Sequence, residues 1–517
     1  FATRGRKMIA WQPAPQPDSP PLTPQTRVWV TAGVLLAILL AALDQTIVAV
    51  AGPRIQRDLQ VSPALYTWLT IAYLVTSTVV LPIAGKLGDR LGRRPLVLFG
   101  LIVFVLGSLA CGFSWNAASL IAFRAFQGLG AGALIAGTTA LVADLYAPRE
   151  RAQIQGLFGA VFGVSSVLGP VVGGLLTDAL SWHWVFFVNV PIGAVAVWII
   201  ARHLPQRNAA AQTTPLDIAG ALSLTGAAVS LLLALSLGSA TPQPGALAFA
   251  WSSWQILTLL TTFAGCLLAF VLIERRAVDP IIDLRLFLNR TFTLSVTAVF
   301  VLGASLLATG VFLPLFLVDV VGVSVTASGL STTPLMFALI ASSIIAGQLV
   351  ARSGRYKPAL LGGLAILIVG FWLLGFTLTP QSTALEVALK MVVVGIGFGP
   401  VVSLYVLAVQ NALPPERTGV ATASVSFFQQ LGSTVGLAVL GATFAAILAG
   451  AGDLSTPGSA AFRETYTGAI SALFRVAALI AGVGVVVTAL LPEVPLRATP
   501  ISTEPSDSGG FLPAEQT

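Results

Sequence analysis

The chain has 517 residues, of which 56% are hydrophobic and only 9% are charged, and its mean hydropathy is +0.91. Soluble globular domains carry about 25% charged residues, so this composition excludes a soluble domain. The formal net charge of +7 does not indicate nucleic-acid binding, because the basic residues lie between long apolar runs. Those runs are continuous rather than alternating, which favours membrane-spanning helices over a membrane barrel. We therefore expect an all-α polytopic membrane protein.

Fourteen apolar runs are long enough to cross a bilayer. In chain order, we expect membrane spans at 28–51, 66–85, 95–114, 117–142, 152–177, 184–202, 216–237, 252–273, 292–318, 327–350, 359–379, 384–410, 418–448 and 468–490. Residues 1–27 and 491–517 are rich in proline and polar residues, and we expect both to be disordered cytoplasmic tails.

The distribution of basic residues predicts the orientation of these spans. If the N-terminus is cytoplasmic, the tails and alternate loops hold 21 of the 27 Lys and Arg residues. The opposite loops hold only Arg54, Arg57 and Arg463. By the positive-inside rule, both termini are expected in the cytoplasm, which requires an even number of spans.

Three short motifs recur in the chain at nearly one offset. The pairs are 85–93 with 347–355, 128–132 with 395–399, and 148–151 with 414–417, at offsets of 262 to 267. Two six-helix bundles related by duplication, residues 28–202 and 292–490, account for this spacing. Residues 203–291 then hold two inserted helices, the seventh and eighth, with their linkers. Such a duplication places a substrate path near mid-membrane, between the two halves.

A charged decapeptide, Gly-Lys-Leu-Gly-Asp-Arg-Leu-Gly-Arg-Arg, occupies residues 85–94. We expect a short loop at the membrane surface, because charged groups are tolerated only outside the hydrocarbon core. One interpretation is a latch that closes the cytoplasmic helix ends by charge and helix-dipole attraction. The alternative is ordinary positive-inside anchoring. The second copy has Ala351 in place of the acid, so we expect no full second latch. The candidate latch residues are Gly85, Asp89, Arg90, Gly92, Arg93 and Arg94.

Asp44 is the acid that lies plainly inside a long apolar span. A carboxylate there costs about 2.5–3.5 kcal/mol unless it has a partner, a proton or a cavity. Arg124, in the fourth span, is expected at comparable depth, and both residues fall in the outer half of the membrane. Protonation of Asp44 could free Arg124, or a substrate could replace the proton. The alternative is a purely structural buried ion pair.

These motifs resemble those of the major facilitator superfamily, and more narrowly those of its fourteen-span drug:proton antiporter family. Residues 85–94 fit the superfamily's cytoplasmic-loop signature, 43–48 the first-helix motif, and 124–130 the fourth-helix motif implicated in proton coupling. Residues 182–193 also fit this branch, with His183 where arginine is usual. The fifth span is similar to the motif associated with antiporters, in which small residues and proline allow close packing and bending. Its residues here are Gly163, Gly169, Pro170, Gly173 and Gly174.

The resemblance implies a major facilitator fold of two six-helix bundles plus two inserted helices, in a bacterial cytoplasmic membrane. It implies a proton-coupled transporter that exports amphipathic or cationic small molecules by alternating access. Export of a lipid or a specific metabolite is an alternative that the same motifs permit. A membrane enzyme or a receptor is disfavoured, because the spans hold no nucleophile–base pair or metal cluster and neither tail forms a domain. We expect no cofactor and no metal, and a monomer whose partners are substrate, protons and the lipid bilayer.

Further polar and aromatic residues are candidates for lining a cavity or a substrate path. In the second half, Gln429 stands where the resembled pattern has arginine, and Val318 stands where it has glutamine before Asp319. Glu386 and Lys390 are four residues apart on the twelfth span, so they could pair with each other or line the cavity. The full set of candidates is Gln45, Gln127, Asp319, Glu386, Lys390, Phe428 and Gln429.

Overall fold

The computed structural model describes residues 23–59, 63–206, 217–239, 249–323, 333–414, 417–449, 459–494 and 496. Within these residues, fourteen helical spans are long and apolar enough to cross a membrane, which confirms the predicted number. Most of both predicted tails lies outside the described residues.

The described residues between 23 and 206 form seven helices. They are α1 Pro24–Asp58, α2 Pro63–Leu91, α3 Arg93–Gly112, α4 Ala117–Leu145, α5 Pro148–Ala179, α6 Trp184–Phe187 and α7 Asn189–His203. The inserted pair is α8 Ile218–Leu237 and α9 Trp254–Glu274, and it is followed by the short 3-10 helix η1, Leu284–Leu288. The remaining helices are α10 Arg290–Phe316, η2 Leu317–Val321, α12 Thr333–Ser353, α13 Lys357–Thr377, α14 Ala384–Ala412, α15 Thr418–Ala449 and α16 Ala460–Ala489.

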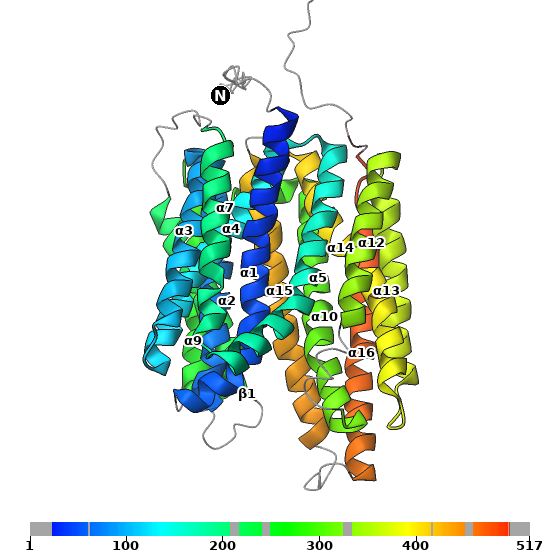
Figure 1. The fold of residues 1–517 in the computed structure, drawn as a ribbon. Coiled ribbons are helices and arrows are strands. Elements are labelled where there is room, and N and C mark those ends of the chain that lie inside the picture. Colours follow the sequence, from blue (N-terminus) through cyan, green and yellow to red (C-terminus); the bar gives the residue numbers. More distant parts are fainter. Residues whose placement is uncertain are drawn as a thin grey trace, which may run out of the picture.

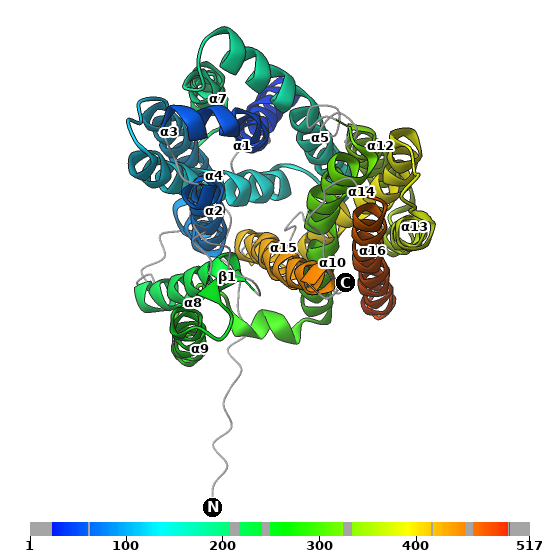
Figure 2. The same ribbon diagram turned by 90° about the horizontal axis from the view of Figure 1, so that it is seen from below.

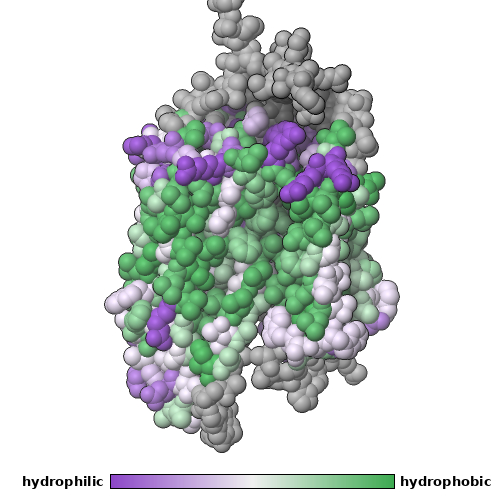
Figure 3. Space-filling model, turned by 180° about the vertical axis from the view of Figure 1, so that it is seen from behind, coloured by the Kyte–Doolittle hydropathy of each residue, from purple (hydrophilic) through white to green (hydrophobic). Residues whose placement is uncertain are grey.

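The helices form two groups that stand side by side (Figures 1 and 2). We call α1 to α7 the N-terminal half and α10 to α16 the C-terminal half. The inserted pair packs outside these groups, with α8 against α2 and α15. Figure 3 shows an apolar band across one face of the molecule, with hydrophilic side chains gathered near its two ends. This distribution is the one that a bilayer imposes on a helical membrane protein.

Each half has a hydrophobic core of its own, and a third core joins the two. One large cluster is built entirely from residues after 285, and another entirely from residues before 205. The shared cluster takes Val79 and Ala84 from α2, Leu224 from α8, and Ala423 and Phe427 from α15. The inserted pair is therefore packed where the two halves meet.

One end of the molecule carries most of the described positive charge, and we call it the basic end. It is the end at which α1, α3 and α5 begin, and its residues include Arg27, Lys86, Arg90, Arg93, Arg94, Arg151, Arg275, Arg276, Arg355, Lys357 and Arg417. Three hydrogen bonds between the halves lie in the part of the bundle nearer this end. They are Val420 N–H to Asp89 at 3.0 Å, Thr78 to Gln430 at 3.4 Å, and Gln410 to the Thr139 carbonyl at 3.5 Å. The halves are thus closed against each other at the basic end.

The prediction of a surface loop at 85–94 is wrong, because nearly all of these residues are helical. Residues 85–91 are the last turns of α2, and Gly92 alone separates them from α3. Gly92 has a φ of 93°, a left-handed conformation that glycine adopts without steric cost. The helix continues because its charged turns lie beyond the apolar part of the span. Gly354, the corresponding residue of the second copy, also has a positive φ, of 71°, as the repeat predicts.

Two predicted spans differ in detail from the structure. The sixth, expected as one helix over 184–202, is interrupted at Val188 between α6 and α7. The ninth runs on beyond Phe316 as a π-helical turn, which ends at Gly322 with a φ of 82°. The expected start of the tenth span, 327–332, lies outside the described residues. Two strands that the sequence did not predict, β1 Gly238–Ser239 and β2 Phe249–Ala250, pair in parallel.

Close helix packing in the N-terminal half yields a test. A Cβ on Gly130 would lie 2.8 Å from the Gly100 carbonyl oxygen and would also collide with the Phe104 backbone, whereas one on Gly174 would meet nothing within 4 Å. We expect Gly130→Ala to destabilise the protein by about 1–3 kcal/mol, because α3 and α4 must separate. The control Gly174→Ala should change stability by less than about 0.5 kcal/mol. Unfolding in detergent measures both, and equal stability of the two variants would contradict the described packing.

Candidate functional site

Asp44 lies on α1 and is fully buried in the N-terminal half. Its Oδ2 accepts a hydrogen bond of 2.5 Å from Arg124 Nη1. Its Oδ1 accepts two more, each 2.9 Å long, from Gln127 Nε2 and Asn189 Nδ2. The two residues singled out from the sequence are therefore in direct contact, and three donors surround the carboxylate. Such a set of donors stabilises a buried negative charge.

The positive partner is equally well surrounded. Arg124 is 1% exposed, and its Nε donates to the Leu69 carbonyl at 3.3 Å. Its Nη1 also donates to Gln127 Oε1 at 2.8 Å, while the guanidinium carbon lies 4.3 Å from the centre of the Tyr73 ring. The ring face adds a cation–π attraction at a desolvated site. Neither charge of the pair meets bulk water.

Helix α4 presents both polar groups on one face, and its glycines pack closely against α2. Arg124 and Gln127 are three residues apart and so lie on one face of the helix. Gly128 and Gly132 on the same helix lie against the α2 backbone, where a Cβ would collide with carbonyl oxygens of α2. Without side chains at these positions, the helices approach closely enough for the polar groups to meet.

Sequence reasoning missed several members of this cluster. Asn189 was noted only as part of a motif, yet its Nδ2 bonds both Asp44 and Ser108 Oγ, the latter at 3.0 Å. Ser108 in turn donates to the Phe186 carbonyl at 2.9 Å. Tyr73 was not considered at all. The signal that could have found Asn189 is its amide inside an apolar span, where polar groups need partners.

The decapeptide 85–94 supplies the contact between α2 and α15. Asp89 Oδ2 accepts from the backbone N–H of Val420, in the first turn of α15, where the helix dipole is positive. Arg93 pairs with Asp89 at 2.6 Å and with Asp144 at 2.8 Å. A Cβ on Gly85 would lie 2.9 Å from the Gly419 carbonyl oxygen, so this glycine allows the two helices to touch.

The two other arginines of the decapeptide contact different elements. Arg90 Nη1 lies 3.7 Å from an oxygen of Asp279, which also forms an ion pair with Lys86. Arg94 Nη2 donates to the Ala201 carbonyl of α7 at 2.7 Å. The six candidate latch residues therefore lie together at the basic end, but Asp89 is the member that bonds the C-terminal half directly.

The segment between α9 and α10 contacts both halves. Glu274 Oε1 accepts from the backbone N–H groups of Ile281 and Ile282 at 3.1 and 3.4 Å, which folds the chain back after α9. Asp279 then pairs with α2, as described above. Asp283 pairs with Arg417, next to the start of α15, at 2.6 Å. The inserted helices are thus attached to the same α2–α15 contact as Asp89.

The glycines of the fifth-span motif divide between two neighbours of α5. A Cβ on Gly163 would collide with Ile340 of α12, in the other half, whereas Gly169 and Gly173 lie against α1, where Thr46 donates to the Ser165 carbonyl at 3.0 Å. Gly174 meets nothing within 4 Å, so its place in the motif has no packing explanation here. Pro170 lies inside the helix. The motif therefore follows α5 where it packs against α12 and then against α1.

The remaining cavity candidates do not gather around Asp44, apart from Gln127. Gln45 is exposed, although it follows Asp44 directly. Lys390 donates to Glu386 at 2.6 Å and to the Thr377 carbonyl at 2.8 Å. Of the two interpretations of these residues, the structure therefore has the one in which they pair with each other.

Besides Glu386 and Lys390, three more candidates lie in the C-terminal half. Asp319 lies on η2 and interacts with Tyr466 of α16. Gln429 lines a small space with Gly303 and Phe398, and Phe428 packs edge-on against Phe287 with ring centres 6.0 Å apart.

His183 occupies the position at which the resembled motif has arginine. Its ring stacks on buried Trp182, with ring centres 3.7 Å apart. Burial lowers the pKa of His183 below its ordinary value, although the charge of Asp58 opposes this shift. The ring is therefore neutral at neutral pH.

Comparison with known proteins decides the family. A sequence model of the Major Facilitator Superfamily matches residues 34–437. The chain belongs to this superfamily. It is 41% identical over 418 residues to the multidrug transporter protein MdtP of Bacillus subtilis, covering 80% of this chain and 75% of that protein. It is 38% identical over 413 residues to multidrug resistance protein 3 of the same organism, covering 80% and 78%.

A solved structure supports the superfamily fold. The crystal structure of the human organic anion transporter MFSD10 (TETRAN) matches with a TM-score of 0.62 and 17% sequence identity, covering 89% of this chain and 100% of that one. This likeness concerns the fold alone. The protein is accordingly a multi-pass membrane protein of a transporter superfamily, and the family match extends from α1 into α15.

The buried ion pair predicts an asymmetric response to mutation. We expect Arg124→Gln to cost about 3–5 kcal/mol of stability, because Asp44 then stays buried without its positive partner. The double variant Asp44→Asn/Arg124→Gln should be more stable than Arg124→Gln alone, since no uncompensated charge remains. Unfolding in detergent for the two single variants and the double variant gives the coupling energy. Additive effects would show that the pair has no net coupling.

The contact between Asp89 and α15 predicts how readily the basic end opens. Thr78 is 3% exposed and faces the other half, so a Thr78→Cys reporter is protected while the halves are in contact. In a background without Cys111 and Cys266, Asp89→Asn should raise the maleimide labelling rate of this cysteine about tenfold, because a charged hydrogen bond is lost. Glu493→Gln, which removes an ion pair with Arg355 inside one half, serves as the control. Equal labelling rates in Asp89→Asn and Glu493→Gln would show that Asp89 anchors the helix end at the membrane surface and does not hold the halves together.

Proposed function

We propose that the protein exports amphipathic, often cationic, small molecules in exchange for protons, by alternating access. The observation that carries this proposal is the buried cluster in which Asp44 binds Arg124, Gln127 and Asn189. The two Bacillus relatives, whose names describe multidrug transport and multidrug resistance, support the substrate class. We further propose that the basic end faces the cytoplasm, in accordance with the positive-inside rule.

In this proposal, Asp44 is the proton-binding group. Protonation removes the charge that Arg124 neutralises, so the arginine then needs another partner or must move. Both changes alter the packing of α1 against α4, which carry the two residues. A proton can in this way favour one arrangement of the helices over another, which is the requirement for coupling.

The closed basic end suggests to which side of the membrane the described state opens. With that end in the cytoplasm, the described arrangement corresponds to the outward-facing stage of the cycle. A proton then reaches Asp44 from outside, and the contact of Asp89 with Val420 must break before substrate enters from the cytoplasm. Gly163 of the fifth-span motif allows α5 to slide on α12 during this change.

The proposal predicts the behaviour of Asp44→Asn in reconstituted vesicles. We expect the variant to lose proton release on addition of an amphipathic cation, and to lose transport driven by a pH gradient by at least about tenfold. Asp178→Asn removes an exposed acid near the end of α5 and is the matched control. Proton-driven exchange at the parent rate in Asp44→Asn would place the coupling group elsewhere.

A further inference from the structure

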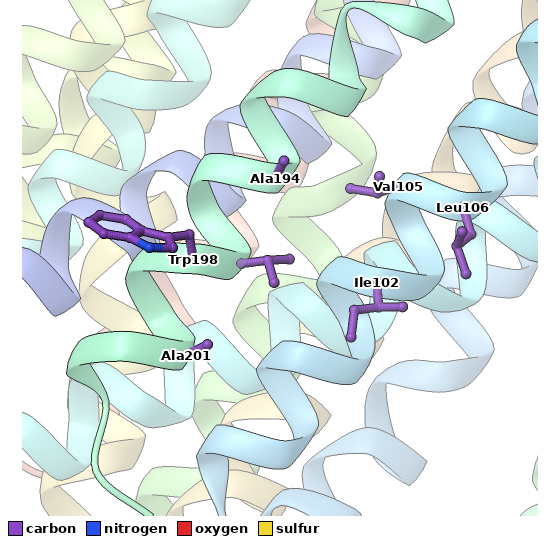
Figure 4. Close-up of a pocket in the computed structure, with 7 residues that line it drawn as sticks. Ile102, Val105, Leu106, Ala194, Trp198 and Ala201 are labelled. Carbon is purple, nitrogen blue, oxygen red and sulfur yellow. The ribbon is translucent and has the colours of Figure 1, made fainter.

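An apolar groove of about 460 Å³ runs along the outside of the N-terminal half, between α3 and α7 (Figure 4). Its walls include Ile102, Val105 and Leu106 from α3, and Ala194, Trp198 and Ala201 from α7. Ile102 is 46% exposed, Leu106 51% and Trp198 60%. The groove therefore opens outward, toward the lipid, and lies on the far side of α3 and α7 from the proposed substrate path.

An apolar groove on a lipid-facing surface does not by itself select a ligand. Lipid chains are as apolar as the leucines and valines that they touch, so chain contact gains little beyond shape complementarity. A specific lipid site needs a polar group at the level of the headgroups. For this groove, such a group would have to lie at its mouth, which is the end of the groove at the basic end of the molecule.

Two arginines lie at the end of the groove that meets the basic end. Arg94 reaches across from α3 and donates to the carbonyl of Ala201, one of the wall residues, at 2.7 Å. Arg202 is the next residue of α7 and is exposed. Among the described residues, neither has a carboxylate partner, whereas Arg93 pairs with Asp89 and Asp144. The mouth thus holds uncompensated positive charge.

Aromatic rings surround the same mouth. His203 stacks on Trp29 of α1 with ring centres 5.4 Å apart, and Trp198 meets it edge-on at 5.9 Å. Tryptophan at this level is typical of the interface between headgroups and hydrocarbon. Charge and depth therefore both fit a negatively charged headgroup.

We propose that this groove is a binding site for an anionic phospholipid of the leaflet at the basic end. One acyl chain lies between α3 and α7, and the phosphate binds Arg94 and Arg202. Basic pockets between membrane helices are known to hold anionic headgroups, and each arginine near the membrane surface strengthens such binding about fivefold. This site is independent of the transport function proposed above.

Native mass spectrometry of the purified full chain tests the site. The protein is equilibrated with equal amounts of phosphatidylglycerol and phosphatidylcholine that carry identical acyl chains. We expect preferential retention of phosphatidylglycerol, reduced about 25-fold in Arg94→Gln/Arg202→Gln. The control Arg276→Gln removes an exposed charge at the same end of the molecule, just after α9 and away from the groove. It should change phosphatidylglycerol retention less than twofold.

Two further variants separate headgroup binding from chain binding and from misfolding. Arg202 forms no hydrogen bond or ion pair with the described residues, so Arg202→Gln should keep the fold and reduce phosphatidylglycerol retention about fivefold. Ala194 is exposed in the groove, and Ala194→Phe should reduce retention of both lipids by filling it. The proposal is overturned if Arg202→Gln matches Arg276→Gln, or if Ala194→Phe leaves retention of both lipids unchanged.

Discussion

The structure of the N-terminal half depends on one constraint, the burial of the Asp44 carboxylate where water is absent. A charge in that place must be neutralised and hydrogen-bonded, and side chains from two other helices converge to do so: Arg124 and Gln127 from α4, and Asn189 from α7. Close approach of the helices requires the glycines of α4, so the packing and the polar cluster specify each other. A change in the charge of Asp44 therefore affects several helices at once, which is what a transport cycle needs from a coupling group.

The two halves have separate cores and meet mainly where α5 packs against α12 and where α2 packs against α15. This division suits alternating access, because each half can move as a body while its own core stays intact. The contact of α2 with α15 combines a charged hydrogen bond, which Asp89 accepts from the Val420 backbone N–H, with glycine packing at Gly85. Such bonds are strong enough to hold one state, and few enough to be exchanged for others.

Most of the architecture could be predicted from the sequence, because span length and charge asymmetry follow directly from the bilayer. The pairing of Asp44 with Arg124 was also predictable, since both are charges at similar depth in apolar spans. The role of Asn189 was not, because an uncharged amide gives a weak signal and its partners are remote in sequence. The conformation of 85–91 was wrongly predicted as a loop, since charge marks the membrane boundary but not the end of a helix. The ion pair of Asp283 with Arg417 could not be predicted, because the two residues are far apart in sequence and no local pattern links them.

That attachment has a geometric consequence. Ile282 is bonded to Glu274 of the inserted pair, and Asp283, the very next residue, is bonded to Arg417 of the C-terminal half. Consecutive Cα atoms are about 3.8 Å apart, so the chain has almost no slack between these two anchor points. The segment therefore acts as a short tether that limits how far the basic end can widen. Because Arg417 is half exposed, its ion pair contributes at most about 1 kcal/mol. The tether therefore sets a distance only while this weak ion pair is intact.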